Sequence, residues 1–208
     1  MTKTPRRFRS SGVNGTYTLL DGSTRIAAAG LAAICFGSFV RAMARHFQAT
    51  RPLARMTRIT AVGGAATAAV HLGGLVALPL WRPWLAVALY AAAIALFHRA
   101  IAATQDCAPR ACFDAGSPRA LATAGPYRYI RHPFYTAYMT AWAAGFAGTG
   151  WWPLLVSGLA MSAIYLRAAR LEERELAGGI HGAAYRVYMR RTGRFLPWKI
   201  ASHAGAIH

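Results

Sequence analysis

Apolar residues fall in five blocks along the chain, separated by shorter stretches that carry most of its arginines. A helix of about 20 residues, rising 1.5 Å per residue, covers the hydrocarbon core of a bilayer, and the second block is long enough to cross it alone. The fourth and fifth blocks are shorter and are joined by Gly148-Thr149-Gly150, which predicts a tight helical hairpin. In chain order the blocks are Ile26–Val40, Ile59–Leu80, Trp84–Ala103, Phe134–Thr149 and Trp151–Leu166.

These blocks predict helices, because every backbone polar group inside lipid must be satisfied locally and the chain lacks the ten-residue alternation of a membrane β-barrel. We therefore expect an all-α integral membrane protein with about five transmembrane helices, the last two forming the hairpin. The expected organisation is a polar, basic N-terminal tail over residues 1–25, three transmembrane helices over 26–103, and a half that carries the chemistry over 104–208.

Composition supports a membrane protein and limits its partners. The chain is 55% hydrophobic and only 14% charged, where soluble domains are about 25% charged. Its net charge of +18 usually indicates nucleic acid or anionic lipid. The basic residues lie in the loops between apolar blocks and no nucleic-acid motif is present, so we expect a bilayer with anionic lipids as partner and no nucleic acid.

The distribution of arginines predicts an orientation. The loop after the first block, the loop before the fourth and the C-terminal segment are arginine-rich and would share one side, which the positive-inside rule makes cytoplasmic. We expect an integral protein of a bacterial inner membrane. The basic residues of the N-terminal tail would then lie outside, so the side on which the tail lies stays open.

Three cysteines, Cys35, Cys107 and Cys112, have neither the number nor the spacing of a disulfide framework or a zinc site. We expect no metal. His71 is the one ionisable residue deep within a predicted span, and we interpret it as a packed, neutral histidine, with a relay as the alternative.

A cluster of polar residues at the start of the fourth block is the first candidate site. The run Gly125-Pro-Tyr-Arg-Tyr-Ile-Arg-His-Pro-Phe-Tyr135 places Arg131 and His132 directly before Pro133, which fits the first position of a helix. The N–H groups and positive dipole end of that helix, with Arg131 beside them, favour binding of a carboxylate. The alternative is a cluster of snorkelling arginines and interfacial tyrosines.

The acidic residues indicate a second part of the same site. Of only six acids in the chain, Glu172, Glu173 and Glu175 gather among arginines just after the fifth block. Ion pairing of Arg170 with Glu173 on the helix surface is the alternative, but such exposed pairs contribute only about 0.3–0.5 kcal/mol. The clustering therefore favours a specific partner.

These motifs occur in an order that resembles the isoprenylcysteine carboxyl methyltransferase and phospholipid methyltransferase superfamily. The resemblance covers about residues 115–198 and rests on the run from Gly125 to Tyr135, a membrane hairpin, Glu172-Glu173, and Tyr185-x-x-Tyr188-x-x-Arg191-Thr-Gly-Arg194-Phe-Leu-Pro197. It implies that the C-terminal half encloses S-adenosylmethionine in a cytoplasmic pocket, while the methyl acceptor enters from the bilayer.

The resemblance also implies which residues line the pocket. Direct spacing puts Ala169 where these enzymes have an acceptor-binding arginine, so the neighbouring Arg170, and Arg194 second, are the candidates for orienting the acceptor. We expect Arg131 to hold the methionine carboxylate. The residues expected at the cofactor are Arg119, Ala120, Leu121, Ala122, Tyr127, Arg131, His132, Pro133, Phe134, Tyr135 and Glu173.

The function expected from this resemblance is methyl transfer from S-adenosylmethionine to a lipophilic acceptor, with carboxyl O-methylation of the isoprenylcysteine type as the leading reaction. A sulfonium methyl group is already activated, so the reaction needs alignment and exclusion of water but no metal. The alternatives are phospholipid N-methylation, methylation of a small thiol, and a non-enzymatic role as a small membrane transporter or assembly subunit.

Overall fold

The computed structural model describes residues 13–46, 51–104 and 122–197 of the chain, and this part contains helices but no strand. This confirms an all-α fold for the described residues. The helices are α1 (Val13–His46), α2 (Arg51–Ala77), α3 (Pro83–Thr104), the short 3-10 helix η1 (Gly125–Arg128), α4 (Pro133–Thr149), α5 (Trp152–Gly178) and α6 (Gly182–Arg191).

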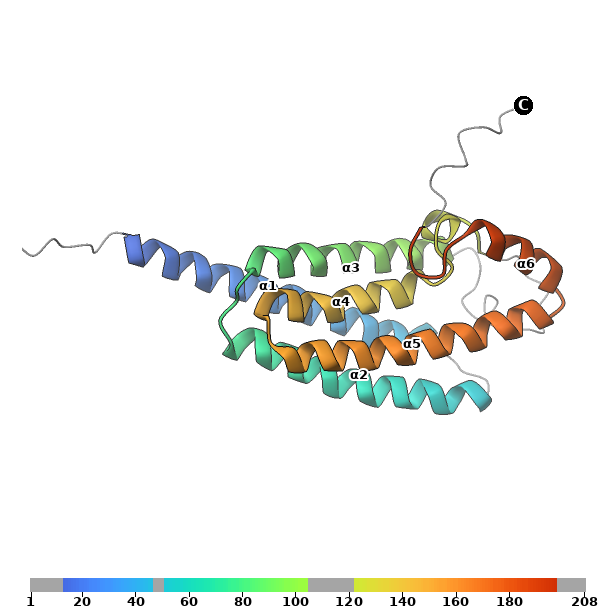
Figure 1. Ribbon diagram of the computed structural model, residues 1–208, viewed down its shortest axis with the longest axis horizontal. Coiled ribbons are helices and arrows are strands. Elements are labelled where there is room, and N and C mark those ends of the chain that lie inside the picture. The colour runs from blue at the N-terminus through green and yellow to red at the C-terminus, as the bar shows by residue number, and fades with distance from the viewer. Residues whose placement is uncertain (1–12, 47–50, 105–121, 198–208) are drawn as a thin grey trace, which may run out of the picture.

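Helices α1 to α5 lie side by side as one bundle, and α6 crosses its end beyond α5 (Figure 1). Helix α4 contacts each of the other four long helices. Small residues on α4 allow this close approach: a Cβ added at Gly148 would lie 2.7 Å from the Cβ of Ala86 on α3. The shortest of the five helices is therefore the centre of the bundle.

Prolines and glycines set several helix ends, although α2 ends before the predicted Leu80. Helix α2 ends at Ala77, before Pro79, and α3 begins at Pro83. The predicted hairpin is present: Gly150 ends α4 with a positive φ of 68°, and its N–H donates to the Phe146 carbonyl at 2.7 Å. The α2–α3 and α4–α5 connections lie together at the same end of the bundle (Figure 1).

Three helices in the described part of the chain are long and apolar enough to cross a membrane. They are Gly22–Ala42 within α1, Pro83–Thr104 and Trp152–Gly178, while Val62–Ala77 within α2 is a shorter apolar segment. These lengths support a membrane protein with at least three candidate spans.

Three helices extend further than the apolar pattern predicts, and one of them is α2, which begins at Arg51 rather than at Ile59. Helix α1 begins at Val13, so the predicted boundary of the tail at residue 25 falls inside a helix; residues 1–12 lie outside the described residues. Helix α5 continues past Leu166 to Gly178. No proline interrupts the extensions of α1 and α5, and Pro52 lies in the first turn of α2, where proline is tolerated. Hydropathy marks only the apolar part of a continuous helix. The extension of α5 brings Glu172 and Glu173 into contact with His132, the residue that precedes α4.

Candidate functional site

The candidate site is assembled where the chain after α6 returns to the entry of α4. Gly193 N–H donates to the Tyr129 carbonyl at 3.0 Å, and Arg131 N–H donates to the Gly193 carbonyl at 2.8 Å. His132 N–H donates to the Arg194 carbonyl at 3.1 Å. These bonds hold two segments that are about 60 residues apart in sequence side by side above the end of α5.

Glu173 on α5 is the hub of this site. Its carboxylate is buried and accepts hydrogen bonds from Arg131 Nε at 2.8 Å and from His132 Nε2 at 3.3 Å, both on Oε1. Arg194 Nη2 donates to Oε2 at 2.6 Å, and Arg194 Nε lies 3.0 Å from Oε1 and 3.1 Å from Oε2. Two guanidinium groups on one buried carboxylate keep it ionised and fix its orientation.

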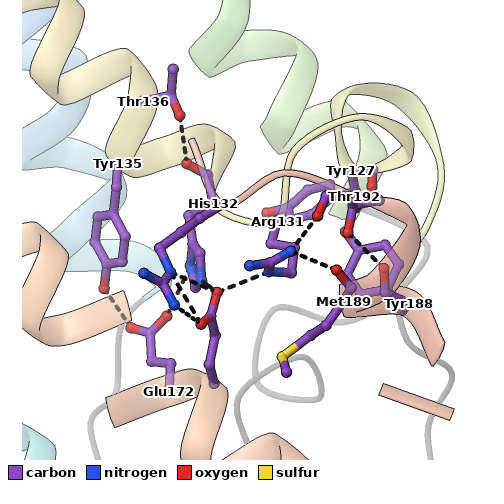
Figure 2. A network of polar contacts seen from close by, with 11 residues as sticks. Tyr127, Arg131, His132, Tyr135, Thr136, Glu172, Tyr188, Met189 and Thr192 are labelled. Carbon is purple, nitrogen blue, oxygen red and sulfur yellow. Dashed lines mark hydrogen bonds and ion pairs between the residues drawn. The ribbon is translucent and has the colours of Figure 1, made fainter. Parts of the chain in front are cut away.

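Arg131 connects α5 to the end of α6. Besides its bond to Glu173, its Nη1 donates to the carbonyls of Met189, at 3.0 Å, and of Thr192 (Figure 2). These carbonyls belong to the last turn and cap of α6, where a cation interacts favourably with the helix dipole. Any anion that Arg131 holds must therefore use its Nη2 group.

His132 lies between two carboxylates. Its Nε2 faces Glu173 and its Nδ1 lies 3.5 Å from Glu172 Oε2. Burial lowers the pKa of His132, but the hydrogen bonds and negative charges of Glu172 and Glu173 outweigh burial and raise it above its ordinary value. Only the doubly protonated ring donates from both nitrogens, so the geometry favours the imidazolium. With His132 charged, the two arginines and two glutamates leave one net positive charge.

Glu172 joins this ionic cluster to aromatic rings in the bundle. The Tyr135 hydroxyl donates to Glu172 Oε1 (Figure 2). The ring of Tyr135 stacks on His132, with centroids 5.5 Å apart, and on Tyr165 of α5, with centroids 5.4 Å apart. A ladder of three aromatic rings thus runs from the ionic cluster into the bundle.

Tyr127 and Tyr188 attach the short helix η1 to α6. The Tyr188 hydroxyl donates to the Tyr127 carbonyl at 2.7 Å. Burial raises the pKa of Tyr188 to about 12, so its phenol stays protonated and remains a donor at neutral pH. Tyr127 itself is buried and packs with Ala122 and Ala100.

Several of the predicted residues meet at this cluster. Arg131, His132, Tyr135, Glu173 and Arg194 form it, and the buried Pro133 begins the helix beneath it. Phe134 packs on Phe97 of α3, and Ala122 lies in the cluster beneath η1. Arg119, Ala120 and Leu121 lie outside the described residues.

Arg170 does not join the cluster. It is exposed on the outer side of α5, whereas Ala169 beside it is fully buried. Arg170 and Glu173 do not form the predicted surface ion pair, because Glu173 turns inward to Arg131 and Arg194. Of the two arginines expected to orient the acceptor, Arg194 is therefore the one that lies at the site.

Sequence reasoning did not assign roles to Glu172, Tyr165 or Tyr188. Part of this could have been predicted from the sequence. Glu172 and Tyr165 recur on the same inward face of α5 as Ala169. Tyr188 belongs to the tyrosine motif near the C-terminus. Their partners lie far away in sequence and required the fold.

Comparison with known proteins adds no relative: no family model, no curated protein and no solved structure matches the chain. Within the described residues, no group of three or more His, Cys, Asp or Glu side chains is placed to hold a metal ion. Arguments about function therefore rest on the geometry of the site and on the motifs that build it.

Proposed function

We propose that this protein is a membrane methyltransferase that uses S-adenosylmethionine to methylate a lipophilic acceptor. The observation that carries the proposal is the buried cluster of Arg131, His132, Glu173 and Arg194 at the end of the bundle. The three segments that contribute these residues are the segments whose motifs resemble the isoprenylcysteine carboxyl methyltransferase superfamily.

The proposed topology has five transmembrane helices, α1 to α5, in a bacterial inner membrane. Three of them meet the length and hydropathy needed to cross alone. The remaining two, α2 and α4, are packed against them, and α4 has neighbours on all sides. The positive-inside rule favours a cytoplasmic position for the end that carries the ionic cluster, because arginines concentrate there.

The residues of the site fit the chemistry of S-adenosylmethionine. The cofactor has a carboxylate, an ammonium, a sulfonium and an adenosine, and the site offers guanidinium groups, carboxylates and stacked aromatic rings. Glu173 Oε2 accepts from Nε and Nη2 of Arg194, and the Nε bond is shared with Oε1, so a ribose hydroxyl or an amino group would bind Oε2 by displacing the shared Nε donor. Tyr127, His132–Tyr135 and Glu173, with the segment Arg119–Ala122, would hold the cofactor.

The protein's own contribution is alignment and exclusion of water. S-adenosylmethionine supplies an activated methyl group when bound, so the chain must orient the acceptor rather than activate the donor. The Arg194 side chain is 33% exposed, against 11% or less for Arg131, His132 and Glu173, so Arg194 is the cation that an entering acceptor meets. A lipophilic carboxylate is the leading acceptor, because it is ionised and needs no base.

The decisive experiment is calorimetric titration of S-adenosylmethionine into the detergent-purified full chain. We expect saturable binding, weakened at least tenfold by Glu173→Gln and by His132→Ala, since each removes a buried polar partner (about 1.4 kcal/mol per tenfold). Matched controls are Glu175→Ala and His98→Ala, which alter exposed residues of the same types.

The outcomes separate the proposals. Equal loss in the control variants would show that the effect is not specific to the cluster. Normal affinity in a well-folded Glu173→Gln protein would remove the central residue assignment. A monodisperse wild-type protein that binds no S-adenosylmethionine would overturn the methyltransferase proposal and favour the transporter or assembly role.

A further inference from the structure

One continuous outer face of α5 is apolar in the first half of the helix and basic in the second half. Its buried residues, among them Leu154, Met161 and Tyr165, recur on the inner side, and Leu155, Val156 and Leu159 on the other side are 39–61% exposed. Further along the same outer side stand three arginines, Arg167, Arg170 and Arg174, all exposed. Their spacing of three and four residues aligns them in one row.

These arginines, here called the α5 arginine row, have no protein partner in the described part of the chain. None of the three belongs to an ion pair there, and Glu172 and Glu173 on the same helix turn to the inner side. Glu175 is exposed but lies about 100° around the helix from Arg174. Three adjacent guanidinium groups repel one another, so an uncompensated row favours an external anion.

The depth of the row matches a lipid headgroup. Counting from the exposed Trp152, the arginines lie about 22, 27 and 33 Å along the helix axis at 1.5 Å per residue, and a bilayer's hydrocarbon core is about 30 Å thick. Trp152, 68% exposed, suits the opposite interface. On this count Arg174 lies in the phosphate layer and Arg170 at the edge of the hydrocarbon, while the Cα of Arg167 lies about 8 Å inside it, a depth from which a long arginine side chain can extend to the interface. The apolar surface that acyl chains would cover lies directly beneath the row.

We infer that the α5 arginine row, with Leu155, Val156 and Leu159 beneath it, is a binding site for an anionic phospholipid of the cytoplasmic leaflet. The arginines hold the phosphate by paired N–H donors, and the apolar residues contact an acyl chain. This site is separate from the ionic cluster, which faces the other side of α5. It gives Arg170 a role other than orienting the methyl acceptor.

The test is a lipid titration of the detergent-purified full chain followed by native mass spectrometry, with phosphatidylglycerol and phosphatidylcholine compared. We expect retention of phosphatidylglycerol over phosphatidylcholine. In the triple variant Arg167→Gln, Arg170→Gln, Arg174→Gln the affinity for phosphatidylglycerol should fall on the order of 100-fold, since each basic residue near an anionic membrane surface contributes about a fivefold effect.

The matched control removes the same charge elsewhere. Arg41→Gln, Arg99→Gln, Arg191→Gln takes three exposed arginines from α1, α3 and α6 at the same end of the bundle. It should retain phosphatidylglycerol to within a few fold. Equal loss in both triple variants would overturn the site in favour of general charge attraction, and unchanged binding in the α5 variant would overturn it directly.

Two further measurements keep the result interpretable. Because the row has no ion-pair partner among the described residues, the melting temperature of the α5 variant in phosphatidylcholine should equal that of the wild type, which separates lost binding from misfolding. Inorganic phosphate at millimolar concentration should not displace bound phosphatidylglycerol, since it lacks the acyl chain. Displacement by phosphate would contradict a lipid site.

Discussion

His71 and His132 are the two histidines buried within the part of the chain whose side chains the structure describes, and their surroundings differ. His71 lies inside the bundle on α2, where Nδ1 faces the Thr67 carbonyl at 3.0 Å and Nε2 faces the Trp142 carbonyl at 3.2 Å. Its ring packs edge-on against Phe36 and Trp142. His132 lies at the end of the bundle between Glu172 and Glu173.

The difference shows how one residue type serves two purposes. His71 touches backbone carbonyls and aromatic rings, and its neutral ring can donate to only one of the two carbonyls that face it, so its role is mainly to fill space among α1, α2 and α4. His132 touches two carboxylates that are themselves held by arginines, so its role is electrostatic. The surroundings of His132, here called the ionic region, and the surroundings of His71, here called the packed region, can each be disturbed by substitution.

The largest expected effect comes from removing the hub of the ionic region. Glu173→Ala leaves Arg131, His132 and Arg194 without their shared carboxylate, and breaking a buried ion pair in this way costs about 3–5 kcal/mol. We expect a strongly lowered melting temperature in detergent. Glu175→Ala, at an exposed site, should change stability by less than about 0.5 kcal/mol. Similar losses in both variants would contradict the hub role.

The link between the ionic cluster and the aromatic ladder should rank next. Tyr135→Phe keeps the ring stacked on His132 but removes the hydroxyl that donates to Glu172, a hydrogen bond to a charged group that contributes about 1.5–3 kcal/mol. Denaturant unfolding would measure the loss. Tyr129→Phe, at a residue 52% exposed, is the matched control and should be nearly neutral.

The packed region can be tested through the glycine that makes room for His71. A Cβ at Gly145 would lie 2.3 Å from His71 Cδ2, so Gly145→Ala forces the ring or α4 to shift and should destabilise by about 1–3 kcal/mol. At Gly37 a Cβ would meet nothing within 4 Å. There, Gly→Ala should be neutral or stabilising by up to about 1 kcal/mol, because alanine favours helix. A neutral Gly145→Ala protein would show that His71 is not tightly packed.

The packed region was the more predictable from sequence. Apolar blocks, prolines and glycines predicted the ends of α3 and α4 and the hairpin at Gly150, because these signals are local. Hydropathy failed to predict helix ends where a helix continues past its apolar residues. It placed the end of the fifth helix at Leu166 rather than at Gly178. Hydropathy predicts only the apolar part of a helix, and α5 continues beyond that part.

The ionic region was predicted only in part. The motifs identified His132 and Glu173, but which arginine meets Glu173 depends on the chain after α6 returning beside Tyr129 and His132. No local pattern encodes that return. Sequence spacing therefore put Arg170 ahead of Arg194 as the candidate, whereas in the fold Arg194 contacts Glu173 and Arg170 does not.

The pH dependence of stability gives the smallest expected effect and compares the two histidines directly. The folded-state pKa of His132 is raised above its unfolded value by Glu172 and Glu173, so its stabilising contribution is complete below about pH 6.5 and is lost as the pH rises through the folded pKa. The melting temperature should therefore fall as the pH rises above about 6.5. His132→Gln should flatten this dependence, because the titrating group is gone. His71→Gln should lower the melting temperature at every pH but leave the slope, since no carboxylate faces His71 among its contacts. A slope that disappears with His71 and survives without His132 would reverse the assignment of charge between the two regions.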